Sequence, residues 1–86
     1  MKRKLNRDAK EIAARGGLSL AEWARRAGVN VSTIKGNINP AQQPKRRGYI
    51  SSVVTWKLVR AYARAAGVTD QEAYAILIIE EPDDKQ

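Results

Sequence analysis

Signals that end one helix and start the next recur along this chain and divide it into short segments. In residues 17–22 and again in residues 67–72, a glycine is followed two positions later by Ser or Thr, and then by Glu three positions further on. Glycine favours the left-handed backbone with which many helices end, and Ser/Thr-x-x-Glu can form a capping box at the start of a helix. The pattern therefore predicts several short helices separated by tight turns.

Apolar side chains recur at helical spacing between these signals. Thirteen alanines make up about a third of the apolar residues, which favours thin, closely packed helices over a sheet core. At 86 residues the chain forms a single domain with a small core. The predicted fold is all-α, a compact bundle of about five short helices over residues 6–15, 19–27, 31 onward, 51 or 52 to 66, and 69–80.

The residue types that are missing exclude several kinds of function. The chain has no Cys and no His, so it offers no disulfide, thiolate, imidazole base or usual zinc ligand. A Ser-Lys pair is the nucleophilic arrangement that stays open. We expect no enzyme activity, metal, cofactor or small-molecule ligand. No apolar run approaches the ~18 residues of a membrane span, which predicts a cytoplasmic protein.

Positive charge is concentrated in the first half of the chain. Residues 1–47 carry a net charge of +9, and residues 48–86 carry −2. Such a bias favours a polyanionic partner, either nucleic acid or an anionic membrane surface. The scatter of cations over loops disfavours a membrane, and the lack of aromatic and glycine-rich RNA motifs disfavours RNA. We divide the chain into a basic N-terminal arm (1–5), a domain (6–80) and a flexible acidic tail (81–86).

The second and third predicted helices are joined by a very short connection. Gly28 ends the helix that begins at Ser19, and Asn30 can cap a helix that opens at Val31. Two short helices joined by a three- to four-residue turn with glycine form the helix-turn-helix arrangement. Residues 39–49 follow as a long loop with two prolines and three adjacent cations.

Residues 18–38 resemble the helix-turn-helix of the phage-repressor and Cro family of DNA-binding proteins. The resemblance depends on Ala24, Gly28, Val29 and the sequence Ser-Thr-Ile at residues 32–34, and residues 58–68 resemble the family's fourth helix. It implies sequence-specific binding of double-stranded DNA by a bacterial or phage-encoded protein associated with the nucleoid. The leading hypothesis is a transcriptional regulator, chiefly a repressor, that binds an inverted repeat as a homodimer.

This resemblance assigns residues to DNA by their position in the motif, since the start of the second motif helix reaches base edges in the major groove. The expected base contacts are Asn30, Val31, Ser32, Lys35 and Asn37, with Asn30 a cap first and a base contact second. The expected backbone contacts on the motif helices are Arg25, Arg26 and Thr33. Positive charge outside the motif adds Lys45, Arg46, Arg47, Lys2, Arg3 and Lys4 as backbone contacts, with a solvated run of charge as the alternative for residues 45–47.

The last predicted helix is apolar on more than one face, and two interpretations can account for this. A small domain can wrap this helix into its core, or Tyr74, Ile78 and Ile79 can form a homodimer patch. Trp23 falls on an inward stripe and is predicted to be core, whereas Trp56 can pack under the long loop or contact a partner.

Two other functions fit the same residues. An activator could use the same fold. Alternatively, the chain is a protein-interaction module such as an antitoxin, with secondary DNA binding, whose acidic tail and last helix neutralise a partner. That alternative predicts that residues 70–86 become ordered only with the partner.

Overall fold

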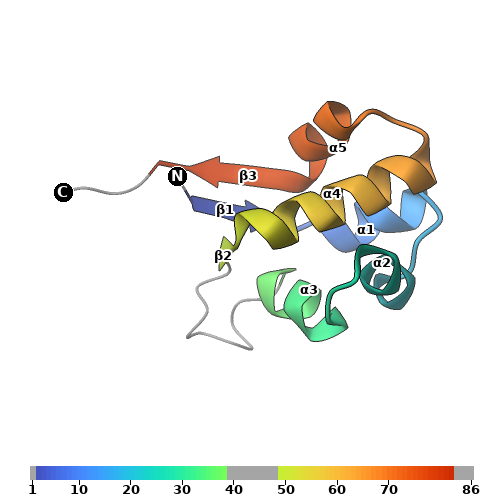
Figure 1. Ribbon diagram of the computed structural model, residues 1–86, viewed down its shortest axis with the longest axis horizontal. Coiled ribbons are helices and arrows are strands. Elements are labelled where there is room, and N and C mark those ends of the chain that lie inside the picture. The colour runs from blue at the N-terminus through green and yellow to red at the C-terminus, as the bar shows by residue number, and fades with distance from the viewer. Residues whose placement is uncertain (1, 39–48, 83–86) are drawn as a thin grey trace.

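The structure contains five helices in the residues that it describes, as the sequence predicts, although the first begins later and the last ends earlier than expected. The computed structural model describes residues 2–38 and 49–82. The helices are α1 (Ala9–Arg15), α2 (Leu20–Ala27), α3 (Val31–Ile38), α4 (Ser52–Ala66) and α5 (Asp70–Leu77). In Figure 1, α4 lies between the pair α2 and α3 on one side and α5 on the other. No helix of the described residues is long and apolar enough to cross a membrane.

Side-chain caps fix the starts of three helices. The side chains of Ser19, Ser51 and Thr69 accept a hydrogen bond from the backbone N–H three residues ahead. At Thr69 the box is complete, because Glu72 also accepts from the Thr69 N–H at 3.0 Å. Helix α1 begins at Ala9, later than the predicted start at residue 6, and Asn6, three residues before it, accepts from the Asp8 N–H at 2.9 Å.

The predicted all-α fold is incomplete, because the structure also contains a small antiparallel sheet. Its strands are β1 (Lys2–Leu5), β2 (Tyr49–Ile50) and β3 (Ile78–Glu81), in the order β2-β1-β3. The prediction of helix up to residue 80 is therefore wrong for its last three residues. The backbone turns extended at Ile78, where two β-branched residues follow each other and the amino-terminal segment supplies a partner strand.

The sheet joins residues far apart in the sequence (Figure 1). Leu5 pairs with Ile78 and Arg3 with Glu80, so β1 is the central strand. Alternate residues of a strand point to opposite faces, and Leu5 and Ile78 are buried on the face toward the helices. The segment predicted as a basic arm thus includes a paired strand, and Glu81, predicted as tail, ends β3.

Charged and aromatic side chains also connect the strands. Lys4 Nζ lies 2.8 Å from a carboxylate oxygen of Glu81, and the Tyr49 hydroxyl donates to Glu81 over 2.8 Å. These two bonds hold the pKa of the Glu81 carboxyl below its usual value, and the bond to Glu81 raises the pKa of Lys4. On the helix side, Arg3 donates to the Tyr74 hydroxyl at 3.0 Å.

Trp23 belongs to the core, as predicted. Its side chain is fully buried, and its indole N–H donates to the Leu58 carbonyl of α4 at 3.0 Å. Ile34 of α3, Leu58 of α4 and Leu77 of α5 are also fully buried. A single tryptophan thus contacts the backbone of the central helix and ties α2 to it.

Part of the apolar surface of α5 and β3 is buried within the molecule. Ile78 is buried, and the ring of Tyr74 stacks on Trp56 with centroids 5.0 Å apart. Trp56 therefore packs against α5, a contact that neither of its predicted roles includes. Of the three dimer candidates, Ile79 retains an exposed surface, at 38%. Ile76, near the end of α5, is 41% exposed.

Candidate nucleic-acid interface

The connection between α2 and α3 has the geometry that the sequence predicts. Gly28 adopts a left-handed backbone with φ 74°, and the Val29 N–H donates to the Ala24 carbonyl at 3.0 Å. Residues 28–30 then lead directly into α3 at Val31. Ala24 and Ile34 are buried, so the two helices pack closely. The turn fixes the start of α3 relative to α2.

The first turn of α3 presents polar side chains to solvent. Asn30, Ser32 and Lys35 are exposed, while Val31 and Thr33 are half-buried. The Thr33 N–H donates to the Asn30 carbonyl at 3.0 Å, so the backbone of Asn30 takes part in the first turn. Of the five predicted base contacts, the structure thus places three at the start of α3 and Lys35 one turn further along.

A groove of about 370 Å³ runs beside this end of α3. Val31 and Lys35 line one wall, the start of α2 lines another, and Lys10 and Ala14 of α1 close it. Lys10 is a functional candidate that the sequence reasoning missed, because only the fold brings α1 next to α3. Two lysines and the positive N-terminal end of α2 give this groove a positive electrostatic potential.

Asn37 is placed differently from the prediction. Its side chain is only 4% exposed, and its amide donates to the Thr33 carbonyl at 2.7 Å. The Asn37 amide oxygen has no hydrogen-bond partner among the described residues. Because α3 continues to Ile38 with Asn37 on its buried side, this side chain does not reach a base in this conformation.

Arg25 and Arg26, the predicted backbone contacts on α2, both bind Glu22. Arg25 donates to Glu22 through two guanidinium nitrogens, and Arg26 Nε lies 2.7 Å from a Glu22 oxygen. These bonds, first that of Arg25 and then that of Arg26, hold the pKa of Glu22 below its usual value. Glu22 therefore stays ionised at neutral pH and neutralises part of this cluster. The Glu22 side chain bonds these two arginines and not the Ser19 N–H, so only one of the two hydrogen bonds of the predicted capping box forms.

Replacing Glu22 with Gln should strengthen binding to duplex DNA. The change removes one negative charge and frees two guanidiniums, so we expect affinity for a random duplex to rise roughly two- to tenfold at 50 mM salt, and less at 200 mM. Fluorescence anisotropy with a labelled duplex measures this. Glu11→Gln makes the same charge change on an exposed residue of α1 and is the matched control. Equal gains from both variants would mean that Arg25 and Arg26 do not contact DNA.

The other predicted backbone contacts fall into two groups. Lys2, Arg3 and Lys4 belong to β1, where Arg3 and Lys4 are bonded within the sheet and Lys2 Nζ lies 5.1 Å from the centre of the Tyr49 ring. They do not form a free arm. Lys45, Arg46 and Arg47 lie outside the described residues.

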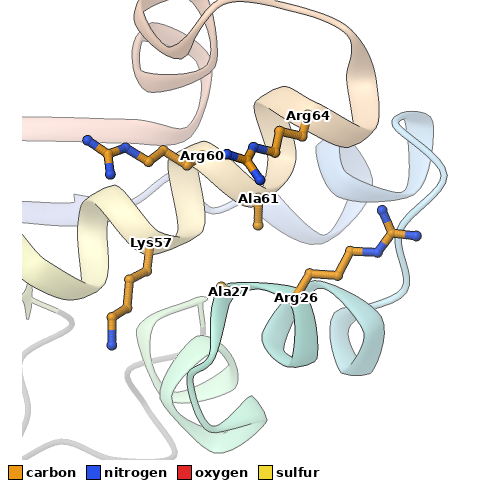
Figure 2. Close-up of a pocket in the computed structure, with 6 residues that line it drawn as sticks. All are labelled: Arg26, Ala27, Lys57, Arg60, Ala61 and Arg64. Atoms are coloured by element: carbon orange, nitrogen blue, oxygen red, sulfur yellow. The ribbon is translucent and has the colours of Figure 1, made fainter.

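A second basic groove, which the sequence reasoning missed, lies between α2 and α4 (Figure 2). It has a volume of about 460 Å³ and is lined by Arg26 and Ala27 of α2 and by Lys57, Arg60, Ala61 and Arg64 of α4. The signal was available in the spacing of the three α4 cations, at i, i+3 and i+7 on one helical face. These cations lie in residues 48–86, where acidic residues give a net charge of −2, so the net charge of that half does not reveal the groove.

Comparisons with models of protein families, with curated proteins and with solved structures give no match to this chain. A function for the chain therefore has to be argued from its own residues and geometry.

Proposed function

We propose that this protein is a cytoplasmic transcriptional regulator that binds double-stranded DNA sequence-selectively through α3. The observation that carries the proposal is the α2–turn–α3 unit, in which a glycine turn holds a short helix that exposes Ser32 in its first turn and Lys35 in its last turn. A major groove about 12 Å wide admits one α-helix. Asn30 and Val31 lie at the start of α3 and complete the proposed base-contacting set.

The proposed contacts follow from side-chain chemistry. Ser32 can donate or accept at several base edges, Lys35 suits the O6 and N7 atoms of guanine, and Val31 suits a thymine methyl group. Lys10 and the N-terminal end of α2 lie beside α3 and would contact the phosphate backbone. Thr33, half-buried on α3, is a further backbone candidate.

We further propose that the protein acts as a repressor by occupying a promoter as a homodimer. Two copies on an inverted repeat, with half-site centres about 34 Å apart, would double the number of phosphate contacts. Ile76 and Ile79, exposed where α5 passes into β3, offer apolar surface for such a contact.

The arrangement of α5 and β3 favours DNA binding over the interaction-module alternative. That alternative needs residues 70–86 to stay free until a partner binds. In the structure, residues 70–81 form α5 and β3, with Ala73, Leu77 and Ile78 buried and β3 paired to β1. Glu80 and Glu81 already bond Tyr74, Tyr49 and Lys4 within the chain.

Chemical-shift mapping by NMR tests which face binds. Adding a random-sequence duplex at 50 mM salt should shift the amide signals of residues 30–35 and of Lys10, because these lie around the groove beside α3. The signals of Ala73 and Leu77, buried in α5, serve as the internal control and should move least. Shifts that leave residues 30–35 unchanged would contradict the proposal.

A further inference from the structure

The groove between α2 and α4 gathers four cations around a small apolar floor. Lys57, Arg60 and Arg64 stand along one face of α4, Arg26 comes from α2, and Ala27 and Ala61 form the floor. Figure 2 shows that these cationic side chains extend from two helices that face each other. The three α4 residues span about 10 Å along the helix, at 1.5 Å per residue.

Two of the four cations have no acidic partner among the described residues, whereas Arg26 is paired with Glu22 at 2.7 Å. Within residues 2–38 and 49–82, Lys57 and Arg64 form no ion pair, and Arg60 Nε lies 3.8 Å from Asp70, a loose contact. Like charges three and four residues apart on a helix repel each other. An anion in the groove would relieve this repulsion along α4.

The groove opens on a different side of α2 from the α3 groove. Ala21 lines the α3 groove, and Arg26 lines the α2–α4 groove. Five residues separate them, which places them about 140° apart around the helix axis at 3.6 residues per turn. A duplex lying along α3 therefore leaves the α2–α4 groove available to another ligand.

The lining indicates which polyanion fits. Arginine side chains bind phosphate oxygens through paired N–H groups, and three of the four cations are arginines. The groove has no aromatic ring on which a base could stack, and no large apolar side chain of the kind that anchors a peptide. Phosphate-backbone contact needs neither of these.

We propose that the α2–α4 groove binds the phosphate backbone of a second DNA segment, so that one protein molecule bridges two duplexes. The bridging role rests on the proposed function of α3, because α3 holds the first duplex. The backbone site itself depends only on the groove.

A capture experiment tests the bridge. A duplex selected for tight binding is immobilised and loaded with protein, and capture of a labelled random-sequence duplex is measured. We expect Lys57→Gln/Arg64→Gln to reduce capture at least tenfold while binding to the immobilised duplex stays within twofold of wild type. Arg7→Gln/Arg15→Gln removes two exposed cations outside both grooves and should capture like the wild type. Circular dichroism checks that all variants are folded.

Three outcomes of this experiment would overturn the proposal. If Lys57→Gln/Arg64→Gln captures as much labelled duplex as the wild type, the two duplexes are held by the α3 helices of two subunits of a dimer and not by the groove. Groove-dependent capture of labelled polyglutamate in place of the duplex would make the groove a site for acidic peptides. Groove-dependent binding of inorganic pyrophosphate, without capture of a duplex by the wild type, would make it a small-anion site.

A second measurement separates the groove from the function of α3. In a Ser32→Ala/Lys35→Ala background, adding Lys57→Gln/Arg64→Gln should reduce the slope of log affinity against log salt by about 1.8, since each lost phosphate contact contributes about 0.9. An unchanged slope would remove the groove from DNA binding. If α3 is not the base-contacting element, this slope still falls while the Ser32 and Lys35 changes have no effect on sequence preference.

Discussion

Replacing Trp23 with Ala is expected to lower the free energy of unfolding by about 3–5 kcal/mol. The side chain is fully buried between α2 and α4, so its removal leaves a large cavity. The Leu58 carbonyl also loses its donor, the indole N–H at 3.0 Å. Because small domains have about 5–15 kcal/mol of stability in total, this one change should remove a large part of it. Urea unfolding followed by circular dichroism measures the loss.

Trp56→Ala is the matched control for the core prediction. Trp56 is half-buried and stacks on Tyr74, a contact worth about 0.5–1.5 kcal/mol beyond the buried area. We expect its loss to cost less than half as much as that of Trp23. Equal costs for the two variants would contradict the assignment of Trp23 as the central packing residue.

Replacing Lys35 with Ala is expected to reduce affinity for a selected duplex about 10- to 100-fold, since a good base contact is worth about 1–3 kcal/mol. Affinity for a random duplex should fall less than threefold, because only one cation is lost. Lys35 is exposed on α3, and alanine is a strong helix former, so the fold should be unaffected. Ser32→Ala should reduce the same preference without changing the charge.

Arg15→Ala is the control for the Lys35 prediction, because it removes one exposed cation at the other end of α1 from Lys10. It should weaken binding to both duplexes slightly and equally. If Lys35→Ala behaves in the same way, Lys35 is a general electrostatic contact, and its assignment as a base contact is wrong.

The helices were predictable because their signals are local. Ser19, Ser51 and Thr69 cap the helices that follow them, and Gly28 and Gly67 adopt the left-handed backbone at their ends. Each of these positions depends on residues within one helical turn. The predicted short connection between α2 and α3 is confirmed, and its glycine signal is equally local.

The sheet was not predictable from local patterns. Leu5 pairs with Ile78, more than seventy positions later, and a basic tetrapeptide gives no strand signal by itself. The apolar run from Leu77 to Ile79 fits a helix segment buried on several sides as well as a strand. Only the presence of β1 beside it decides between the two, and that is a tertiary contact.

The candidate site was predictable in part. Ile34 is buried, and Ser32 and Lys35 lie away from its side of α3, so their exposure could be predicted from helical spacing. The ion pairs of Glu22 with Arg25 and Arg26 have i, i+3 and i, i+4 spacing and could have been identified from the sequence. Asn37 lies three residues after Ile34, on the same side of α3, so its burial could also have been inferred from spacing.

Selection of bound sequences from a pool of random double-stranded DNA tests sequence-selective binding through α3. We expect enrichment of one motif, arranged as an inverted repeat with half-site centres about one helical turn, ~34 Å, apart. The preference at one or two base pairs in each half-site should be lost when the selection is repeated with Lys35→Ala. A pool that stays random after successive rounds, while the folded protein still binds duplex at low salt, would contradict sequence-selective binding through α3.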